Sequence, residues 1–137
     1  MLGMTFRENA IQVTGKGGID YMDSLQMAEK IVRTLSNKKA EDITLLKIED
    51  LTVISDYFVI ATATNSTQIK ALANEVEYEL EKDGVKLLHQ EGYDSASWIL
   101  LDYNGVIVHL FLKDSRMFYS LERLWSDASE VDVSEWL

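Results

Sequence analysis

Apolar residues recur at every second position on both sides of Asn104-Gly105, and this pattern predicts a β-hairpin over residues 98–111. Asparagine and glycine both tolerate the positive φ that a type I′ turn requires at its two central positions, so we expect that turn here. One face of the hairpin is then apolar and belongs to the core. Its predicted cross-strand pairs are Ile99 with Leu110, Leu101 with Val108, and Tyr103 with Val106.

The opposite face of the hairpin mixes aromatic, aliphatic and charged residues. It carries Trp98, Leu100, Asp102, Ile107, His109 and Phe111. In one interpretation, helices cover both faces of the sheet and His109 is an interior histidine. In the other, the first three residues lie at a poorly covered edge, where tryptophan beside an acid is typical of protein-binding surfaces. Both interpretations stay open, and Asp102 and His109 lie near enough on this face to form a hydrogen bond.

Helical and strand periods in the rest of the chain predict an α/β fold. A helix begins at Asp23, where Gln26 completes a capping box, and a second helix ends at Asp83-Gly84. Asp114 is expected to cap a last helix that continues to Trp125. Strands are predicted at 43–48, 57–63 and 85–90. With the hairpin they form a mixed five-stranded sheet with helices packed on it.

The two ends of the chain show no sustained hydrophobic period. Residues 1–21 contain scattered apolar positions and several glycines, and we expect a disordered leader or an expression remnant there. Residues 127–137 carry four acids and no base, which predicts a flexible acidic tail. A single α/β domain is therefore expected over residues 22–126.

Composition narrows the class of protein. The 137 residues suffice for one domain with a core, and zero cysteines excludes disulfides, thiolate metal sites and cysteine nucleophiles. No apolar run reaches the roughly 20 residues that span a bilayer, and no signal pattern is present, so a cytoplasmic protein is expected. The 23 acidic against 13 basic residues give a charge of -10, which disfavours RNA binding and favours a basic protein partner.

Catalytic motifs are missing from the sequence. Neither histidine has metal-ligand spacing, no glycine-rich phosphate loop occurs, and no turn presents a serine nucleophile. We therefore expect no catalytic residue, metal site or cofactor. The alternative is a degenerate nucleotide-binding site near Asp56 and the hydroxyl-rich segment Thr62–Ser66, which precedes a helix but lacks glycines.

Several short motifs, in this order, resemble the ribosomal silencing factor family (Iojap, RsfS). They are Ser55-Asp56-Tyr57-Phe58, Glu91-Gly92, Ser97-Trp98, Val108-His109, and Arg116 followed by Leu121-Glu122-Arg123-Leu124-Trp125. The resemblance extends from about Asp23 to Ser126. It departs from the family pattern at Ala63 and Thr67.

The resemblance implies a nucleotidyltransferase-like α/β sandwich without catalytic carboxylates, acting as a translation factor rather than an enzyme. Family members bind the large ribosomal subunit through its basic ribosomal protein fourteen, block joining of the small subunit when nutrients are short, and are often homodimers. Carried onto this sequence, the family pattern matches Trp98, Asp102 and Glu91-Gly92. We expect partner contacts at Trp98, Leu100, Asp102, Tyr103, Glu91 and Tyr93.

Overall fold

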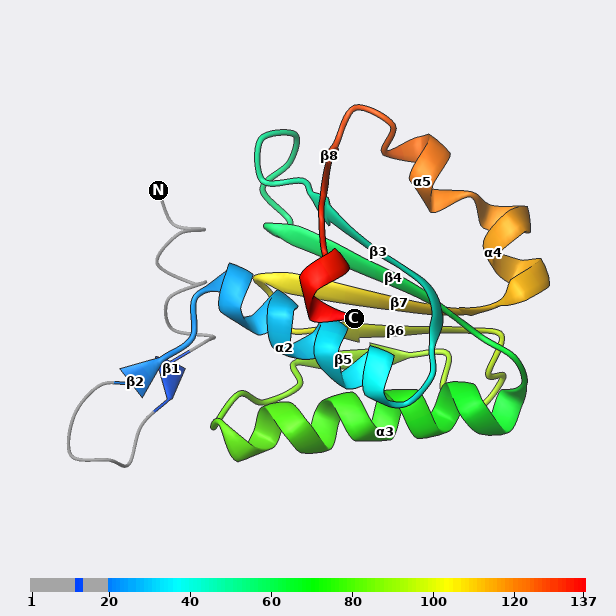
Figure 1. Cartoon of the computed structure of the whole chain (residues 1–137), viewed down its shortest axis with the longest axis horizontal. Coiled ribbons are helices and arrows are strands. Elements are labelled where there is room, and N and C mark those ends of the chain that lie inside the picture. The colour runs from blue at the N-terminus through cyan, green and yellow to red at the C-terminus, as the bar shows by residue number, and fades with distance from the viewer. Residues whose placement is uncertain (1–11, 14–19) are drawn as a thin grey trace.

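The computed structural model describes residues 12–13 and 20–137, and shows one large sheet with helices on both of its faces (Figure 1). The helices are α2 (Ser24–Asn37), α3 (Ser66–Lys82), α4 (Lys113–Tyr119), α5 (Leu121–Leu124) and the 3-10 helix η1 (Ser134–Trp136). The strands of the sheet are β3 (Glu41–Lys47), β4 (Tyr57–Ala63), β5 (His89–Glu91), β6 (Trp98–Asp102), β7 (Val106–Leu112) and β8 (Ser129–Val131).

The predicted leader, residues 1–21, lies mostly outside the described residues. Within it, two short strands, β1 (Gln12–Val13) and β2 (Asp20–Tyr21), pair with each other in antiparallel fashion. The expectation of a disordered leader was therefore wrong for these four residues, which form paired strands.

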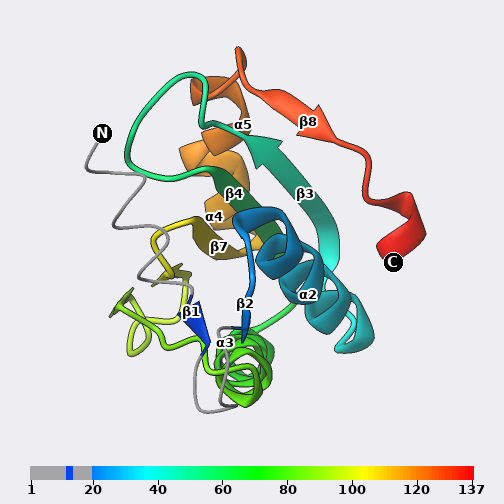
Figure 2. The same ribbon diagram turned by 90° about the vertical axis from the view of Figure 1, so that its left-hand side faces the viewer.

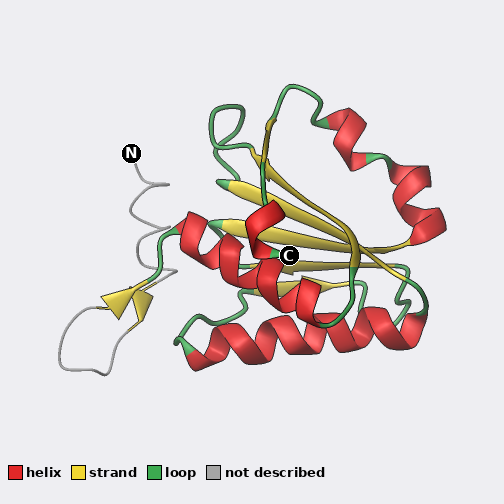
Figure 3. Ribbon diagram, in the orientation of Figure 1, coloured by secondary structure: helices red, strands yellow, loops and turns green. Residues whose placement is uncertain are grey.

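The sheet, drawn in yellow in Figure 3, has the strand order β5-β6-β7-β4-β3-β8, which the labels of Figure 1 allow the reader to follow. The pair β4 and β7 is parallel and the other neighbours are antiparallel, so the sheet is mixed. All seven residues of β4 are buried, as expected for a central strand covered on both faces. The predicted fold class is confirmed, with six strands in place of five.

Helices lie on both sides of the sheet (Figure 2). On one side α2 and α3 pack against β3, β4, β6 and β7 and enclose the larger core, which includes Ile31, Leu72 and Val108. On the other side α4 contacts β4 and β7, and a smaller cluster forms around Phe58 and Phe111. The second side is thus covered over only part of its width by the described helices.

The ends of α2 and α3 follow their sequence signals. Asp23 and Gln26 form the predicted capping box, with the Asp23 carboxylate accepting from the Gln26 backbone N–H at 2.8 Å. Gly84 has a φ of 79° and ends α3 as expected. The N–H of Val85 then donates to the Leu80 carbonyl, closing a Schellman motif. This ties residue 85 to the helix end, so the strand predicted at 85–90 was wrong at its start and β5 begins only at His89.

The predicted hairpin register is confirmed, but its turn is not type I′. Asn104 has a φ of 72°, whereas Gly105 is not among the positive-φ residues. The glycine is needed for a close approach: a Cβ at this position would lie 2.3 Å from the Ser24 hydroxyl oxygen. Its carbonyl also accepts from the backbone N–H groups of Asp56 and Tyr57. The turn is therefore shaped by docking against the starts of α2 and β4.

The C-terminal third differs most from prediction. Ser120, with a φ of 51°, divides the expected last helix into α4 and α5, and Asp114 lies in the first turn of α4 rather than at its N-cap. The flexible tail predicted at 127–137 was wrong, because β8 pairs with β3 and Val133 is buried in the core. Without β8, strand β3 would expose an unpaired edge.

Candidate functional site

The register of β5, β6 and β7 places six side chains on the second side of the sheet, beyond the part that α4 covers. Directly opposed residues of an antiparallel pair share a face, and the printed pairs are Glu91 with Leu100, His89 with Asp102, and Asp102 with Ile107. We call this surface the open face. It consists of His89, Glu91, Trp98, Leu100, Asp102 and Ile107.

The open face is apolar at its centre and acidic at its margin. Trp98, Leu100 and Ile107 are each half-buried, so each still presents surface to a partner. Glu91 has 67% of its side chain exposed, and its carboxylate oxygen Oε2 lies within hydrogen-bond distance of His89 Nε2, at 2.6 Å. One oxygen of Asp102 accepts the Asn104 N–H at 2.7 Å. An aromatic anchor with an acidic rim results, a composition that suits a basic protein surface.

Both interpretations of the mixed hairpin face hold, each for a different part. His109 and Phe111 are buried, at 5% and 0% exposure, as the covered interpretation requires. Trp98, Leu100 and Asp102 remain half-buried, as the interpretation of a poorly covered edge requires. The division follows the place of each strand: His109 and Phe111 lie on β7 inside the sheet and contact the rings of Phe58 and Trp98, whereas β6 is one strand from the edge.

The six predicted contact residues do not all lie together. Trp98, Leu100, Asp102 and Glu91 share the open face. Tyr103 is 1% exposed and belongs to the core on the α3 side, so it does not fit a surface contact. The Tyr93 hydroxyl accepts from Asn74 of α3 at 3.0 Å, which places this ring away from the open face.

Sequence reasoning missed two members of the open face as contact residues, His89 and Ile107. Ile107 was already assigned to the mixed hairpin face, and that assignment was the available signal. His89 had no such signal, since its place depends on the pairing of β5 with Asp102.

His109 lies directly beneath Trp98 and is its hydrogen-bond partner. The Trp98 Nε1–H donates to His109 Nδ1 at 3.1 Å, and the expected bond between Asp102 and His109 is replaced by this one. Burial lowers the pKa of His109 from its ordinary value near 6.5 to about 4. The imidazole is therefore neutral at pH 7, as an acceptor nitrogen requires.

This buried histidine makes folding stability depend on pH. Because the unfolded chain protonates near pH 6.5 and the folded chain only near about 4, the unfolded chain binds more protons between these values. Stability is fully present above pH 6.5 and falls as the pH drops toward 4. We expect a loss of about 2 kcal/mol from this residue between pH 7 and pH 5. Urea unfolding at both pH values, in the wild type and in His109→Leu, measures it. Equal pH dependence in the two proteins would contradict the prediction.

The alternative nucleotide site is not assembled. Asp56 precedes β4 and Thr62–Ser66 ends it, so the two lie at opposite ends of a strand about 20 Å long. Thr64 N and Oγ1 both donate to the Gln68 side chain, and Asn65 caps Gln68 N. Thr64 and Asn65 are engaged in capping α3, and the Thr62 hydroxyl accepts a hydrogen bond from Arg116.

Arg116 joins both sides of the helix break to the sheet. Its guanidinium donates to the Glu122 carboxylate, the Asp42 carbonyl, and the hydroxyls of Thr44 and Thr62. These bonds occupy all five N–H donors of the side chain, which is 12% exposed. Arg116 and Glu122, both carried by the family motif, thus hold α4 and α5 against the ends of β3 and β4.

We expect Arg116→Met to lower the free energy of unfolding by about 2 kcal/mol, since the buried Thr62 hydroxyl and the half-buried Thr44 and Glu122 lose their donor. The matched control is Arg123→Met on α5, an exposed position where a change of about 0.5 kcal/mol or less is expected. Chemical denaturation of both variants measures the difference. Equal stabilities would show that the Arg116 network contributes nothing.

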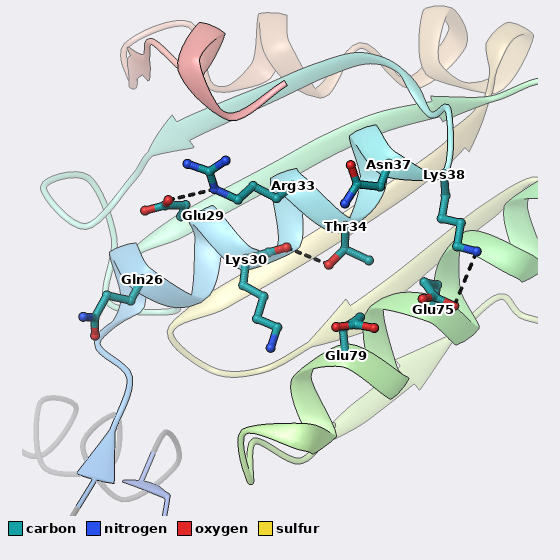
Figure 4. Close-up of a pocket in the computed structure, with 9 residues that line it drawn as sticks. All are labelled: Gln26, Glu29, Lys30, Arg33, Thr34, Asn37, Lys38, Glu75 and Glu79. Carbon is teal, nitrogen blue, oxygen red and sulfur yellow. Dashed lines mark hydrogen bonds and ion pairs between the residues drawn. The ribbon is translucent and has the colours of Figure 1, made fainter.

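A groove of about 420 Å³ between α2 and α3 is lined by charged and polar side chains (Figure 4). Many of its charges are paired: Lys38 Nζ lies 4.0 Å from Glu75 across the groove, and Arg33 Nε lies 2.8 Å from Glu29 within α2. Such exposed ion pairs contribute little free energy. The groove is a charged seam between two helices.

Two kinds of feature are absent from residues 12–13 and 20–137, which the structure describes. No cluster of three or more His, Cys, Asp or Glu side chains there is arranged to hold a metal ion. No helix there has the length and apolar character to cross a membrane.

A family model described as "Ribosomal silencing factor during starvation" matches residues 21–137. The chain belongs to the ribosomal silencing factor family. The match includes residues 127–137, in agreement with the place of β8 in the sheet. The family is one of ribosome-associated regulatory factors, and the resemblance carried by the short motifs is confirmed.

Relatives of this family agree in sequence and in fold. The chain is 39% identical over 97 residues to the ribosomal silencing factor RsfS of Bacillus subtilis, covering 71% of this chain and 82% of that protein. It is 34% identical over 112 residues to RsfS of Halalkalibacterium halodurans, covering 82% and 96%. A crystal structure of a Chromobacterium violaceum protein is similar with a TM-score of 0.75 at 33% identity, covering 77% of this chain and 88% of that one.

Proposed function

We propose that this chain represses translation under nutrient limitation by binding the large ribosomal subunit and blocking, by its bulk, the joining of the small subunit. The observation that carries the proposal is the open face, where half-buried Trp98, Leu100 and Ile107 share one surface with the carboxylates of Glu91 and Asp102. The family description, which names silencing during starvation, supports the same role.

The proposed partner is the basic ribosomal protein fourteen of the large subunit, as the family resemblance implies. The charge of -10 opposes sequence-independent binding to a phosphate backbone and speeds encounter with a cationic protein. Glu91 and Asp102 bring this acidity to the margin of the open face. Recognition therefore rests on a protein surface within the ribosome rather than on RNA.

Steric exclusion needs affinity and placement but no bond making. We accordingly propose a non-enzymatic factor that requires no cofactor. Calorimetric titration with nucleotides and magnesium tests the alternative, because a nucleotide site should release saturable heat.

Sucrose-gradient analysis of purified subunits tests the proposed function. Added protein is expected to move large subunits from the joined 70S peak to free 50S particles, with the protein comigrating with the free large subunit. Binding to isolated ribosomal protein fourteen without RNA tests the partner. An unchanged 70S fraction at saturating protein would refute the proposal.

We further propose a cytoplasmic location, as the sequence pattern led us to expect, and a homodimer, which the resemblance implies. Sedimentation equilibrium of the purified chain checks the dimer. A single species at monomer mass across the working concentrations would contradict it.

A further inference from the structure

The indole of Trp98 is held by two contacts of different kinds. Its ring stacks on Phe111, with centroids 4.9 Å apart and planes at 28°. Its Nε1–H donates to His109 Nδ1 at 3.1 Å. Stacking defines the plane of the ring, and the hydrogen bond defines which edge points into the protein. The indole therefore has one orientation before any partner arrives.

His109 is itself tightly positioned. It lies in the middle of β7, paired with Leu100 on one side and Ile60 on the other. The edge of Phe58 packs against its ring at a centroid distance of 4.8 Å and an angle of 78°. At 5% exposure, the imidazole has no room to follow a mobile indole. It acts as a rigid acceptor.

The hydrogen bonding of His109 explains why a histidine occupies this position, since its hydrogen-bond partner is the Trp98 indole. When Nδ1 accepts the indole proton, Nε2 carries the hydrogen of the neutral ring. Within the described residues Nε2 is buried without a hydrogen-bond partner, which is unfavourable. An apolar side chain would avoid this cost in the same slot. What histidine adds over an apolar residue is the acceptor for Trp98.

We propose that His109 is a positioning residue that holds the Trp98 indole with its N–H turned inward, ready to dock on the partner protein. This inference rests on the proposed function, in which Trp98 is the anchor of the open face. Ordering a side chain before binding removes that entropy cost from the association step. An indole whose N–H is already bonded also needs no acceptor from the partner. The pocket that receives Trp98 is then apolar or cationic, and it meets the carbon atoms of the ring.

Three variants test the energetic claim. His109→Leu removes the acceptor and is expected to weaken large-subunit binding about tenfold. His109→Asn returns an oxygen near the position of Nδ1 and should restore binding to within about threefold of wild type. In a Trp98→Ala background, His109→Leu should cause no further loss, because the side chain that it orients is gone. Wild-type affinity in His109→Leu, or additive losses in the double variant, would overturn the proposal.

A spectroscopic readout separates this inference from the proposed function. In nitrogen–proton spectra of the wild-type chain, His109 Nδ1 should show the shift of an unprotonated nitrogen, and the Trp98 indole proton should exchange slowly. In His109→Leu, the indole proton should shift and exchange faster while the other tryptophan signals stay in place. A protonated Nδ1 in wild type would refute the positioning role even if His109→Leu did not fold. If wild type failed to bind the large subunit but showed these signals, only the proposed function would fall.

Discussion

Trp98→Ala is expected to weaken binding of the large ribosomal subunit by about 3 kcal/mol, on the order of a hundredfold, while the domain stays folded. The side chain is half-buried, so its removal costs the fold less than the loss of a core tryptophan would. Binding suffers more because the indole is the largest apolar group on the open face and is held in one orientation by Phe111 and His109.

Co-sedimentation with purified large subunits measures this loss. The matched control is Tyr78→Ala, which removes an aromatic ring that is 58% exposed on α3, on the opposite side of the sheet. That variant should bind like wild type. If a folded Trp98→Ala protein bound the large subunit as tightly as wild type, the open face would not be the docking surface. If both variants lost binding, the effect would not be specific to the open face.

Gly92→Ala is expected to destabilise the domain by about 3 kcal/mol. The residue has a φ of 83°, and a Cβ there would lie 2.0 Å from the carbonyl oxygen of Trp98. The obstructing atom belongs to the backbone at the start of β6, so a side-chain rotation cannot relieve the clash. The substitution must displace either the Glu91-Gly92 turn or the strand that carries Trp98.

Gly84→Ala provides the control for the Gly92 prediction. Gly84 shares a positive φ, 79°, at the exposed end of α3, so its substitution measures the cost of the backbone conformation. We expect about 1 kcal/mol there. Guanidinium unfolding of both variants gives the difference, which is the contribution of the contact with Trp98. If the two losses were equal, the close approach at Gly92 would carry no energetic weight.

Much of the fold could be predicted because its signals are local. The apolar run Tyr57–Ala63 became a fully buried strand with the predicted bounds. The capping box at Asp23 involves residues three apart, and the hairpin register follows from alternation around Asn104. These signals depend on neighbours along the chain, and the folded structure retains them.

Three of the errors share a cause in contacts between distant segments. β8 forms because β3 offers an edge, although the two strands are more than 80 residues apart. The turn at Gly105 adapts to Ser24 of α2, and local turn preferences do not include that contact. The break at Ser120 accompanies an arginine that bonds to the two strands β3 and β4. No short sequence window contains both partners of any of these contacts.

The candidate site divides in the same way. Trp98, Leu100 and Asp102 share a face by strand alternation, so the sequence placed them together. Tyr103 was misplaced because its neighbourhood in the chain is that of the site, while its side chain points to the opposite side of the sheet. His89 belongs to the open face only because β5 pairs with β6, which sets His89 opposite Asp102.

The sequence by itself determined the family, the class of fold, the hairpin register and the acidic character of the chain. The tertiary structure alone decided which side chains pack over the second side of the sheet, and therefore that His109 is buried while Trp98 remains half-exposed. The physical reason is that alternation sets the side to which a residue points, whereas burial depends on which distant element packs over that side.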